Sequence, residues 1–208
     1  DICVGYVEEV YFRRINRWNF MSEKIAVLVG GSELFSGMRG MSKGTKHIYK
    51  AIHESFDEVV IINYNYFLDF GSSLKKLFNY LSSKSNTTYV ILYGYSKGGD
   101  VVLQLSRMLQ SALNINLLIT IDVANGPWSH KIDRTIPHNV KKNINVYQSI
   151  PNFPLRSYGM QTVAVSADTI IENIDLTRQN IQWIAVTHST IENLMVDKVI
   201  TWIKTNVE

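Results

Sequence analysis

The chain alternates short runs of β-branched and other apolar residues with longer stretches in which apolar residues recur at helical spacing. Strands that alternate with helices are typical of crossover connections, which join parallel strands in one sheet. The alternation therefore predicts an α/β fold with a mostly parallel central sheet. The predicted strands cover residues 24–31, 58–66, 87–95, 115–122, 141–150 and 180–190, and the predicted helices cover residues 44–56, 71–83, 101–113 and 191–207. Residues 152–177 have a less regular pattern, which predicts a hairpin or an excursion from the sheet.

The length of the chain, 208 residues, is enough for one domain with a substantial core. No internal repeat, low-complexity tract or linker indicates a second domain, and Met21 reads like a natural start. We therefore expect a single domain over residues 21–208, preceded by residues 1–20 as an N-terminal extension, a processed remnant or an artificially added segment. Charged residues interrupt the apolar ones in this leading segment, so it does not read as a secretory signal. We expect it to pack against the domain.

Charge and cysteine content argue against several classes of function. The 21 basic and 18 acidic residues leave a formal net charge of +3, and because the lysines are scattered we expect no nucleic-acid partner. No apolar run approaches the roughly 18 residues that cross a bilayer, so we expect no transmembrane segment and favour a soluble, cytoplasmic protein. The single cysteine, Cys3, has neither a disulfide partner nor the neighbours of a zinc site, and no metal is expected.

The stretch ILYGYSKGGD, residues 91–100, contains the pattern G-x-S-x-G at Gly94, Ser96 and Gly98. A buried strand is predicted before this pattern and an amphipathic helix after it, so the serine lies where a strand turns sharply into a helix. Such a turn forces an unfavourable backbone conformation on the serine and brings neighbouring chain close, and glycines on both sides relieve the crowding. The pattern therefore predicts that the Ser96 hydroxyl stands above the sheet as a nucleophile, within reach of a base.

Backbone N–H groups near Ser96 are candidates for stabilising a developing oxyanion. Lys97 begins the predicted helix, so its N–H has no acceptor within that helix and can face the substrate. A second donor is expected from the stretch VLVGGSELFSG, where Gly30 and Gly31 allow main chain to approach a substrate closely. The N–H of Gly31 or of Ser32 is the candidate, and we favour Ser32.

A serine nucleophile needs a base, and the base needs an acid to orient it. His188 follows the last predicted strand and precedes the last helix, which would place its ring over the carboxyl ends of the strands beside Ser96. Asp122 ends a predicted buried strand between the serine and the histidine in sequence, so it is the preferred acid. A capping role for either residue is the alternative. The other histidines are His47, His53, His130 and His138, on a predicted helix or in a polar loop. The rival acids are Asp168 and Asp175, whereas Asp133 lies too far into a loop.

The order Ser96, Asp122, His188, together with the G-x-S-x-G pattern and a glycine-rich loop after the first strand, resembles the α/β-hydrolase family over residues 25–205. The stretch ITIDVANGP, residues 119–127, places the acid after the strand that follows the nucleophile helix, which resembles some lipases. The resemblance implies a three-layer α/β/α sandwich with a mostly parallel central sheet. It also implies two-step acyl transfer through an acyl-enzyme, with no metal and no organic cofactor.

Apolar and aromatic residues near the predicted site would line a groove for an acyl chain or simply pack the domain. The candidates for the pocket are Leu34, Phe35, Trp128 and Phe153. We therefore predict a serine hydrolase of esterase or lipase type that acts on a small-molecule or lipid ester. The alternatives are an acyl thioesterase with the same residues and a non-catalytic binding protein on the same scaffold. A nucleotide-binding domain is disfavoured, because residues 29–37 lack both G-x-G-x-x-G and the lysine of a P-loop.

Overall fold

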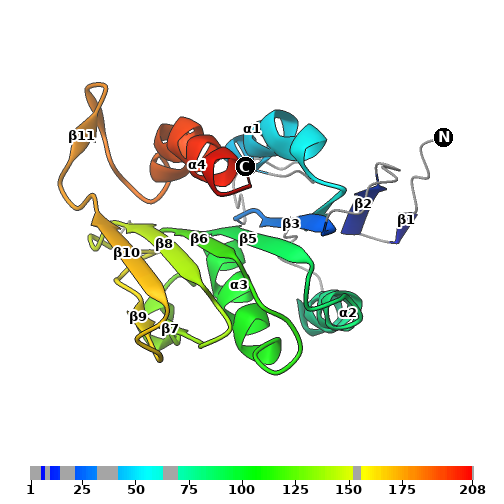
Figure 1. The fold of residues 1–208 in the computed structure, drawn as a ribbon. Coiled ribbons are helices and arrows are strands. Elements are labelled where there is room, and N and C mark those ends of the chain that lie inside the picture. The colour runs from blue at the N-terminus through cyan, green and yellow to red at the C-terminus, as the bar shows by residue number, and fades with distance from the viewer. Residues whose placement is uncertain are drawn as a thin grey trace.

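A central sheet with helices on both faces makes up the computed structural model, as Figure 1 shows. The structure describes residues 6–7, 10–14, 22–31, 42–62, 70–151 and 156–207. Within these residues the sheet has eight strands, in the order β1 (Tyr6–Val7), β2 (Val10–Arg14), β4 (Glu58–Ile62), β3 (Lys24–Val29), β5 (Tyr89–Tyr95), β6 (Leu117–Ile121), β8 (Lys142–Tyr147) and β10 (Ile170–Asp175). The strands from β4 to β10 run parallel, while β2 pairs antiparallel with β4, and β1 with β2. The segment before Met21 therefore contributes strands to one edge of the sheet.

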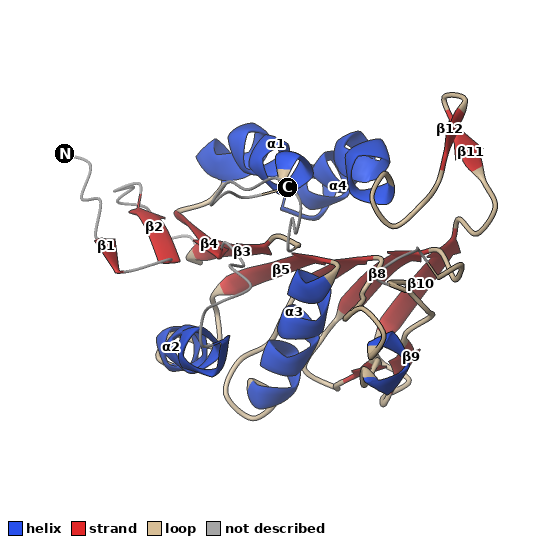
Figure 2. Cartoon of the chain, turned by 180° about the vertical axis from the view of Figure 1, so that it is seen from behind, coloured by secondary structure: helices blue, strands red, loops and turns tan. Residues whose placement is uncertain are grey.

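Helices cover the two faces of the sheet, which gives three layers (Figure 2). On one face lie α1 (Lys43–Ile52) and α4 (Ile191–Val207), and on the other lie α2 (Phe70–Ser82) and α3 (Lys97–Met108). Single turns of 3-10 helix are η1 (His53–Ser55) and η2 (Ser129–Lys131). Among the described residues, none of the helices combines the length and the apolar character that crossing a membrane requires. The predicted α/β/α sandwich with a mostly parallel sheet is confirmed.

Alternating side chains of the parallel strands build a core on each face of the sheet. Val27 and Leu92 pack into the core beneath α2 and α3, whereas Leu28 and Tyr93, the next residues along the same strands, pack into the core beneath α1 and α4. All four are 0% exposed. Because successive side chains of a strand point to opposite faces, a strand covered on both faces needs an unbroken apolar run. This requirement explains the runs KIAVLV and YVILYGY.

One predicted strand of the sheet is wrong. Residues 180–190 instead contain β11 (Asn180–Ile181) and β12 (Ile184–Ala185), which pair antiparallel as a hairpin that projects from the domain (Figure 1). Gln182, with φ of 50°, and Trp183, with φ of 66°, reverse the chain in the left-handed region of the backbone. Such two-residue turns normally use glycine or asparagine, so the apolar sequence here gave no sign of a turn.

The last strand of the sheet comes from residues 152–177, for which we predicted a hairpin or an excursion. β10 pairs in parallel with β8 at the edge of the sheet, and its side chains are exposed or half-buried. An edge strand needs no continuous apolar run, so the sequence IIENID did not read as part of a buried sheet. The same region supplies β9 (Val163–Ala164), which pairs with β7 (Thr135–Ile136) in a separate two-stranded sheet.

A buried carboxylate, Glu192, joins three elements of the fold. Its Oε1 accepts hydrogen bonds from the hydroxyl of Ser42 (2.7 Å), from the main-chain N–H (3.1 Å) and hydroxyl (2.8 Å) of Thr45, and from the hydroxyl of Tyr93 (3.0 Å). Ser42 and Thr45 lie at the start of α1, Tyr93 lies in β5, and Glu192 itself lies in the first turn of α4. Burial raises the pKa of Glu192 above its ordinary value of 4.5, although these donors act to lower it.

We expect Glu192→Gln to change the way stability depends on pH. A carboxyl group with a raised pKa in the folded chain gives its full stabilisation below the ordinary pKa of 4.5, and that contribution is lost as the pH rises through the folded-state pKa. The amide does not titrate, so the wild type should lose stability relative to the variant as the pH rises. Urea unfolding of both proteins between acidic and neutral pH measures this, and a pH-independent difference would contradict the expectation.

Shortening a side chain in the core should destabilise the fold far more than shortening one at the surface. Leu92 is fully buried in β5, so Leu92→Ala is expected to lower the free energy of unfolding by about 2–5 kcal/mol, through lost apolar contacts and the cavity left behind. Val165 is 69% exposed, and Val165→Ala should change stability by less than about 0.5 kcal/mol. Urea unfolding followed by tryptophan fluorescence compares the variants, and equal losses would argue against the core described above.

Candidate active site

The turn between β5 and α3 holds Ser96 in a strained backbone conformation. Its φ of 55° and ψ of −120° lie outside the regions that residues with a side chain ordinarily adopt. A Cβ at Gly94 would lie 2.5 Å from the carbonyl oxygen of Gly98, and a Cβ at Gly98 would lie 2.2 Å from that of Val29. Glycine is therefore required on both sides of Ser96, which is the physical reason for the G-x-S-x-G pattern.

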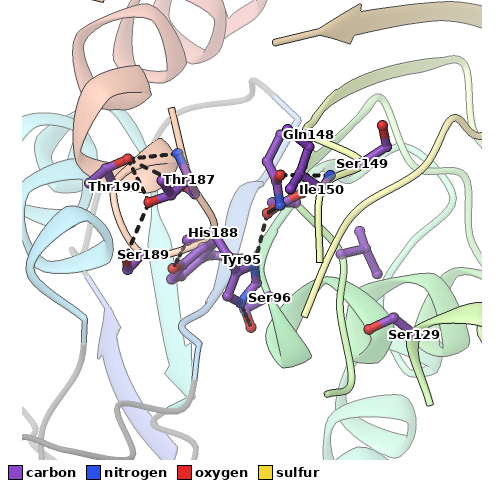
Figure 3. A network of polar contacts seen from close by, with 12 residues as sticks. Tyr95, Ser96, Ser129, Gln148, Ser149, Ile150, Thr187, His188, Ser189 and Thr190 are labelled. Atoms are coloured by element: carbon purple, nitrogen blue, oxygen red, sulfur yellow. Dashed lines mark hydrogen bonds and ion pairs between the residues drawn. The ribbon is translucent and has the colours of Figure 1, made fainter. Parts of the chain in front are cut away.

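Ser96, His188 and Asp122 form a continuous hydrogen-bonded chain. The Oγ of Ser96 lies 2.8 Å from Nε2 of His188, and Nδ1 of His188 lies 2.7 Å from Oδ2 of Asp122. An ionised carboxylate only accepts hydrogen bonds, so Nδ1 donates to Asp122 and Nε2 is left to accept the hydroxyl proton of Ser96. Figure 3 shows Ser96 beside His188 and Tyr95. A serine, a base and an orienting acid in this geometry can perform nucleophilic catalysis.

These three residues come from loops at the carboxyl ends of neighbouring strands or from the loop before α4. Ser96 directly follows β5, and Asp122 directly follows the adjacent strand β6. The N–H of Asp122 donates to the carbonyl oxygen of Val146 in β8 (2.7 Å), which fixes its left-handed backbone. His188 follows β12 of the projecting hairpin, and not a strand of the sheet as we predicted.

The other histidines and acids are exposed or bond residues close to them in sequence. His47, His130 and His138 are exposed, and Nδ1 of the half-buried His53 lies 3.0 Å from the carbonyl oxygen of Lys50. Asp133 and the rival acids Asp168 and Asp175 are exposed, and each bonds a residue two positions away: Asp133 to Thr135, Asp168 to Ser166, and Asp175 to Thr177. Each of these carboxylates stabilises a local turn.

Main chain from two elements lies beside Ser96, where an oxyanion would form. Lys97 is the first residue of α3, so its N–H has no acceptor within the helix. A Cβ at Gly31 would lie 2.8 Å from the ring of Tyr95 and 3.0 Å from Cβ of Ser96. The backbone of Gly31 therefore packs closely against Tyr95 and Ser96, where a side chain would not fit.

The structure describes one of the four residues predicted to line the pocket. Ser32, the favoured second oxyanion donor, and Leu34, Phe35 and Phe153 lie outside the described residues. Trp128 is described: it lies in the loop after Asp122, its side chain is 56% exposed, and Nζ of Lys131 sits 4.6 Å from its ring centroid. Trp128 is thus an exposed residue paired with a cation rather than a packed one.

Two residues that the sequence analysis did not single out contact this chain of hydrogen bonds. The hydroxyl of Tyr95 donates to the carbonyl oxygen of His188 (2.6 Å), and the two rings stack with centroids 5.6 Å apart. Gln148 donates to both oxygens of Asp122, from its main-chain N–H and from Nε2, each at 3.0 Å. Tyr95 lies inside the G-x-S-x-G pattern at a variable position, whereas Gln148 has no local sequence signal.

Asp122 is fully buried, and its charge is compensated by nearby donors. Burying an ionised carboxylate is unfavourable unless it is paired and hydrogen-bonded, and here His188 and Gln148 supply the hydrogen bonds. The guanidinium of Arg134 donates to the carbonyl oxygen of Val123 (3.1 Å) and interacts electrostatically with Asp122. Burial lowers the pKa of Arg134. In the part of the chain that the structure describes, no three His, Cys, Asp or Glu residues are grouped as metal ligands.

Comparisons with known proteins bear on the fold. No family model matches the chain, and no curated protein matches it. Among solved structures, it is similar to an α/β serine hydrolase without a lid from Xanthomonas campestris (12% identity, TM-score 0.56, covering 100% of this chain and 94% of that one). It is also similar to dienelactone hydrolase from Anabaena variabilis (12%, 0.53, 98% and 94%) and to an α/β serine hydrolase homologue from Coxiella burnetii (10%, 0.54, 100% and 97%). Likeness at this level of identity shows the fold alone, and the chain therefore has an α/β-hydrolase fold.

Proposed function

We propose that this protein is a serine hydrolase that cleaves carboxylic esters, with Ser96 as nucleophile, His188 as base and Asp122 as the orienting acid. The observation that carries the proposal is the hydrogen-bonded chain from Oγ of Ser96 through His188 to Asp122, with contacts of 2.8 and 2.7 Å. This chain lies at a strained turn at the carboxyl edge of the sheet. Strain of this kind is retained where the surrounding structure enforces it, commonly at functional sites.

In the first half of the reaction the enzyme is acylated. Nε2 of His188 takes the hydroxyl proton as Oγ of Ser96 attacks the ester carbonyl carbon, and the electron pair of the carbonyl bond moves to its oxygen. Asp122 stabilises the imidazolium that forms. When the tetrahedral intermediate collapses, the bond to the alcohol oxygen breaks, and Nε2 returns its proton to that oxygen. The alcohol leaves, and the acyl group remains as an ester on Ser96.

In the second half, water takes the place of the serine hydroxyl. His188 removes a proton from water as it attacks the acyl carbonyl, and the proton is then given to Oγ of Ser96 when the carboxylic acid departs. In both halves the negative oxygen needs hydrogen-bond donors already in position. The N–H of Lys97 and that of Gly31 or Ser32 are the groups we assign to this task, because Lys97 opens α3 and Gly31 packs against Ser96.

The names of the structural neighbours support an acyl-transfer reaction without identifying a substrate. One is described as a serine hydrolase and another as a dienelactone hydrolase, and a lactone is a cyclic ester. A thioester carbonyl would be attacked by the same residues, so an acyl thioesterase is the neighbouring possibility. A set of esters and thioesters that share the same acyl groups separates these two activities.

Removing the nucleophile or the base should abolish turnover. We expect the wild type to hydrolyse p-nitrophenyl esters and to be labelled by a fluorophosphonate probe, and Ser96→Ala and His188→Ala each to lose at least about 10³-fold in kcat. The measurement is turnover over a series of acyl lengths, beside acyl-CoA thioesters of the same lengths. The length profile then reports the size of the acyl site.

Ser85→Ala is the matched control for the serine variant, because Ser85 is exposed and its hydroxyl bonds Thr87, two positions away. It should keep full activity and labelling. A folded wild type that turns over neither ester nor thioester and is not labelled by the probe would refute catalysis and would favour a binding protein on this scaffold.

Adding a methyl group at the turn should displace the nucleophile. A Cβ at Gly98 would lie 2.2 Å from a main-chain oxygen of β3, which cannot move aside, so Gly98→Ala is expected to lower kcat by about tenfold or more and to destabilise the fold. Gly99→Ala is the comparison: its Cβ would lie 2.7 Å from the side chain of the buried Val123, which must also shift, and a smaller loss is expected because a side chain moves more readily than main chain. Ester turnover per probe-labelled molecule compares the two, and equal activity would contradict the explanation of the glycine pattern.

A further inference from the structure

The chain that follows β8 encloses the carboxylate of Asp122. Gln148 is the first residue after β8 and is 2% exposed. Its main-chain N–H donates to Oδ1 of Asp122 and its side-chain Nε2 donates to Oδ2, both at 3.0 Å. Oδ2 is also the atom that accepts from Nδ1 of His188 (2.7 Å). The side chain of Gln148 and the imidazole therefore share one carboxylate oxygen.

The orientation of the Gln148 amide is set by a second contact. The main-chain N–H of Ile150 donates to Oε1 of Gln148 (2.9 Å). Because an N–H can bond only the oxygen of the amide, Nε2 must face Asp122. Figure 3 shows Gln148 and Ile150 together beside the candidate site. The N–H of Ile150 thus orients the Gln148 amide so that its Nε2 donates to the Asp122 carboxylate.

The other carboxylate oxygen is covered by backbone from further along the chain. A Cβ at Gly159 would lie 2.3 Å from Oδ1 of Asp122, so no larger residue fits there without displacing the acid. The N–H of Gly159 donates to the carbonyl oxygen of Gln148 (2.8 Å), which holds these two residues together beside Asp122. The complete burial of Asp122 follows from these contacts.

We propose that Gln148 is a positioning residue that holds the Asp122 carboxylate toward His188 and limits its basicity. The proposal rests on the serine hydrolase function proposed above. A carboxylate that accepts hydrogen bonds from neutral donors binds a proton less tightly. The donor on Oδ2 therefore keeps the proton of the pair on Nδ1 of His188 and lets Nε2 release its proton to the leaving alcohol. The amide is suited to this task because it donates without adding charge.

The remaining titratable neighbours of this pair are few among the described residues. Tyr95 stacks on His188 and donates to its carbonyl oxygen, and Arg134 interacts electrostatically with Asp122. Both stay unchanged in the variants below. In Gln148→Met, which adds no charge, a change in the titration of His188 therefore reports the loss of the Gln148 donor.

Gln148→Met removes the amide while keeping a side chain of similar length. The Asp122 carboxylate then becomes more basic and holds the imidazolium more strongly, so the acidic limb of the kcat/KM profile should move to higher pH, by about half a unit or more. We expect kcat to fall by about tenfold with KM little changed, because the lost contact acts on the charged imidazolium. Gln148→Glu places a second carboxylate beside the first and should shift the limb further.

A matched control lies on α3. Nε2 of Gln104 donates to Oδ1 of Asp100 at 3.0 Å, so Gln104→Met removes the same kind of contact from an acid outside the candidate site. It should leave the pH profile unchanged. Gly159→Ala is a second variant that acts on Oδ1 of Asp122 without touching the Gln148 side chain. We expect it to lower kcat as well.

The titration of His188 itself is read by NMR of the imidazole, with the signal assigned by its absence in His188→Ala. This measurement needs no turnover, so it separates the two proposals: an inert wild type refutes the hydrolase, while an upward shift of the His188 titration in Gln148→Met still supports the positioning role. If Gln148→Met does not fold, Gln148→Leu, which also removes the amide without adding charge, carries the test. A folded variant with the wild-type His188 titration and pH profile overturns the proposal, even if its stability is reduced.

Discussion

The main chain of Ser96 is hydrogen-bonded on both sides to the segment that carries the acid. Its N–H donates to the carbonyl oxygen of Ile121 (2.9 Å), and its carbonyl oxygen accepts from the N–H of Ala124 (3.2 Å). These two residues flank Asp122 closely, so one pair of contacts sets the position of the serine relative to the acid. The packing of Gly98 against β3 then fixes the direction of α3. The strained turn persists because the surrounding strands leave it no other conformation.

Two buried carboxylates, Asp122 and Glu192, lie close to His188 in space or in sequence, and their surroundings differ. Asp122 accepts hydrogen bonds from the imidazole of His188 and the amide of Gln148, and it interacts electrostatically with the guanidinium of Arg134. Two of these partners, His188 and Arg134, can carry a positive charge. Glu192 meets hydroxyl groups and one main-chain N–H, and burial raises its pKa. The first carboxylate is equipped to stabilise a cation, while the second joins α1, β5 and α4. Both depend on hydrogen bonds that the fold supplies.

The parts of the molecule that are buried on both faces were predictable from sequence, because continuous apolar runs such as those of β3, β5 and β6 are typical of strands that helices cover on both faces. Ser96, Asp122 and His188 were predicted to lie together because each follows a predicted strand, and the carboxyl ends of parallel strands meet at one edge of the sheet. The structure brings these residues within hydrogen-bond distance. The edge strand β10 was mispredicted because its exposed side chains give no continuous apolar run. The β11–β12 hairpin was mispredicted because its left-handed turn contains neither glycine nor asparagine. The contact of Gln148 with Asp122 depends on β6 and β8 being neighbours, which only the sheet order reveals.

The long-range hydrogen bonds of Glu192 and His188 also bear on how the chain folds during its synthesis. Ser42 and Glu192 are 150 positions apart in the chain, and His188 is 92 positions from Ser96. A chain emerging from the ribosome therefore exposes its serine and its acid well before the histidine exists. Contacts between such distant residues form slowly, since a long loop must first be closed. In the mechanism proposed above, Ser96 therefore has no base until the segment that carries His188 has been synthesised and has packed onto the domain.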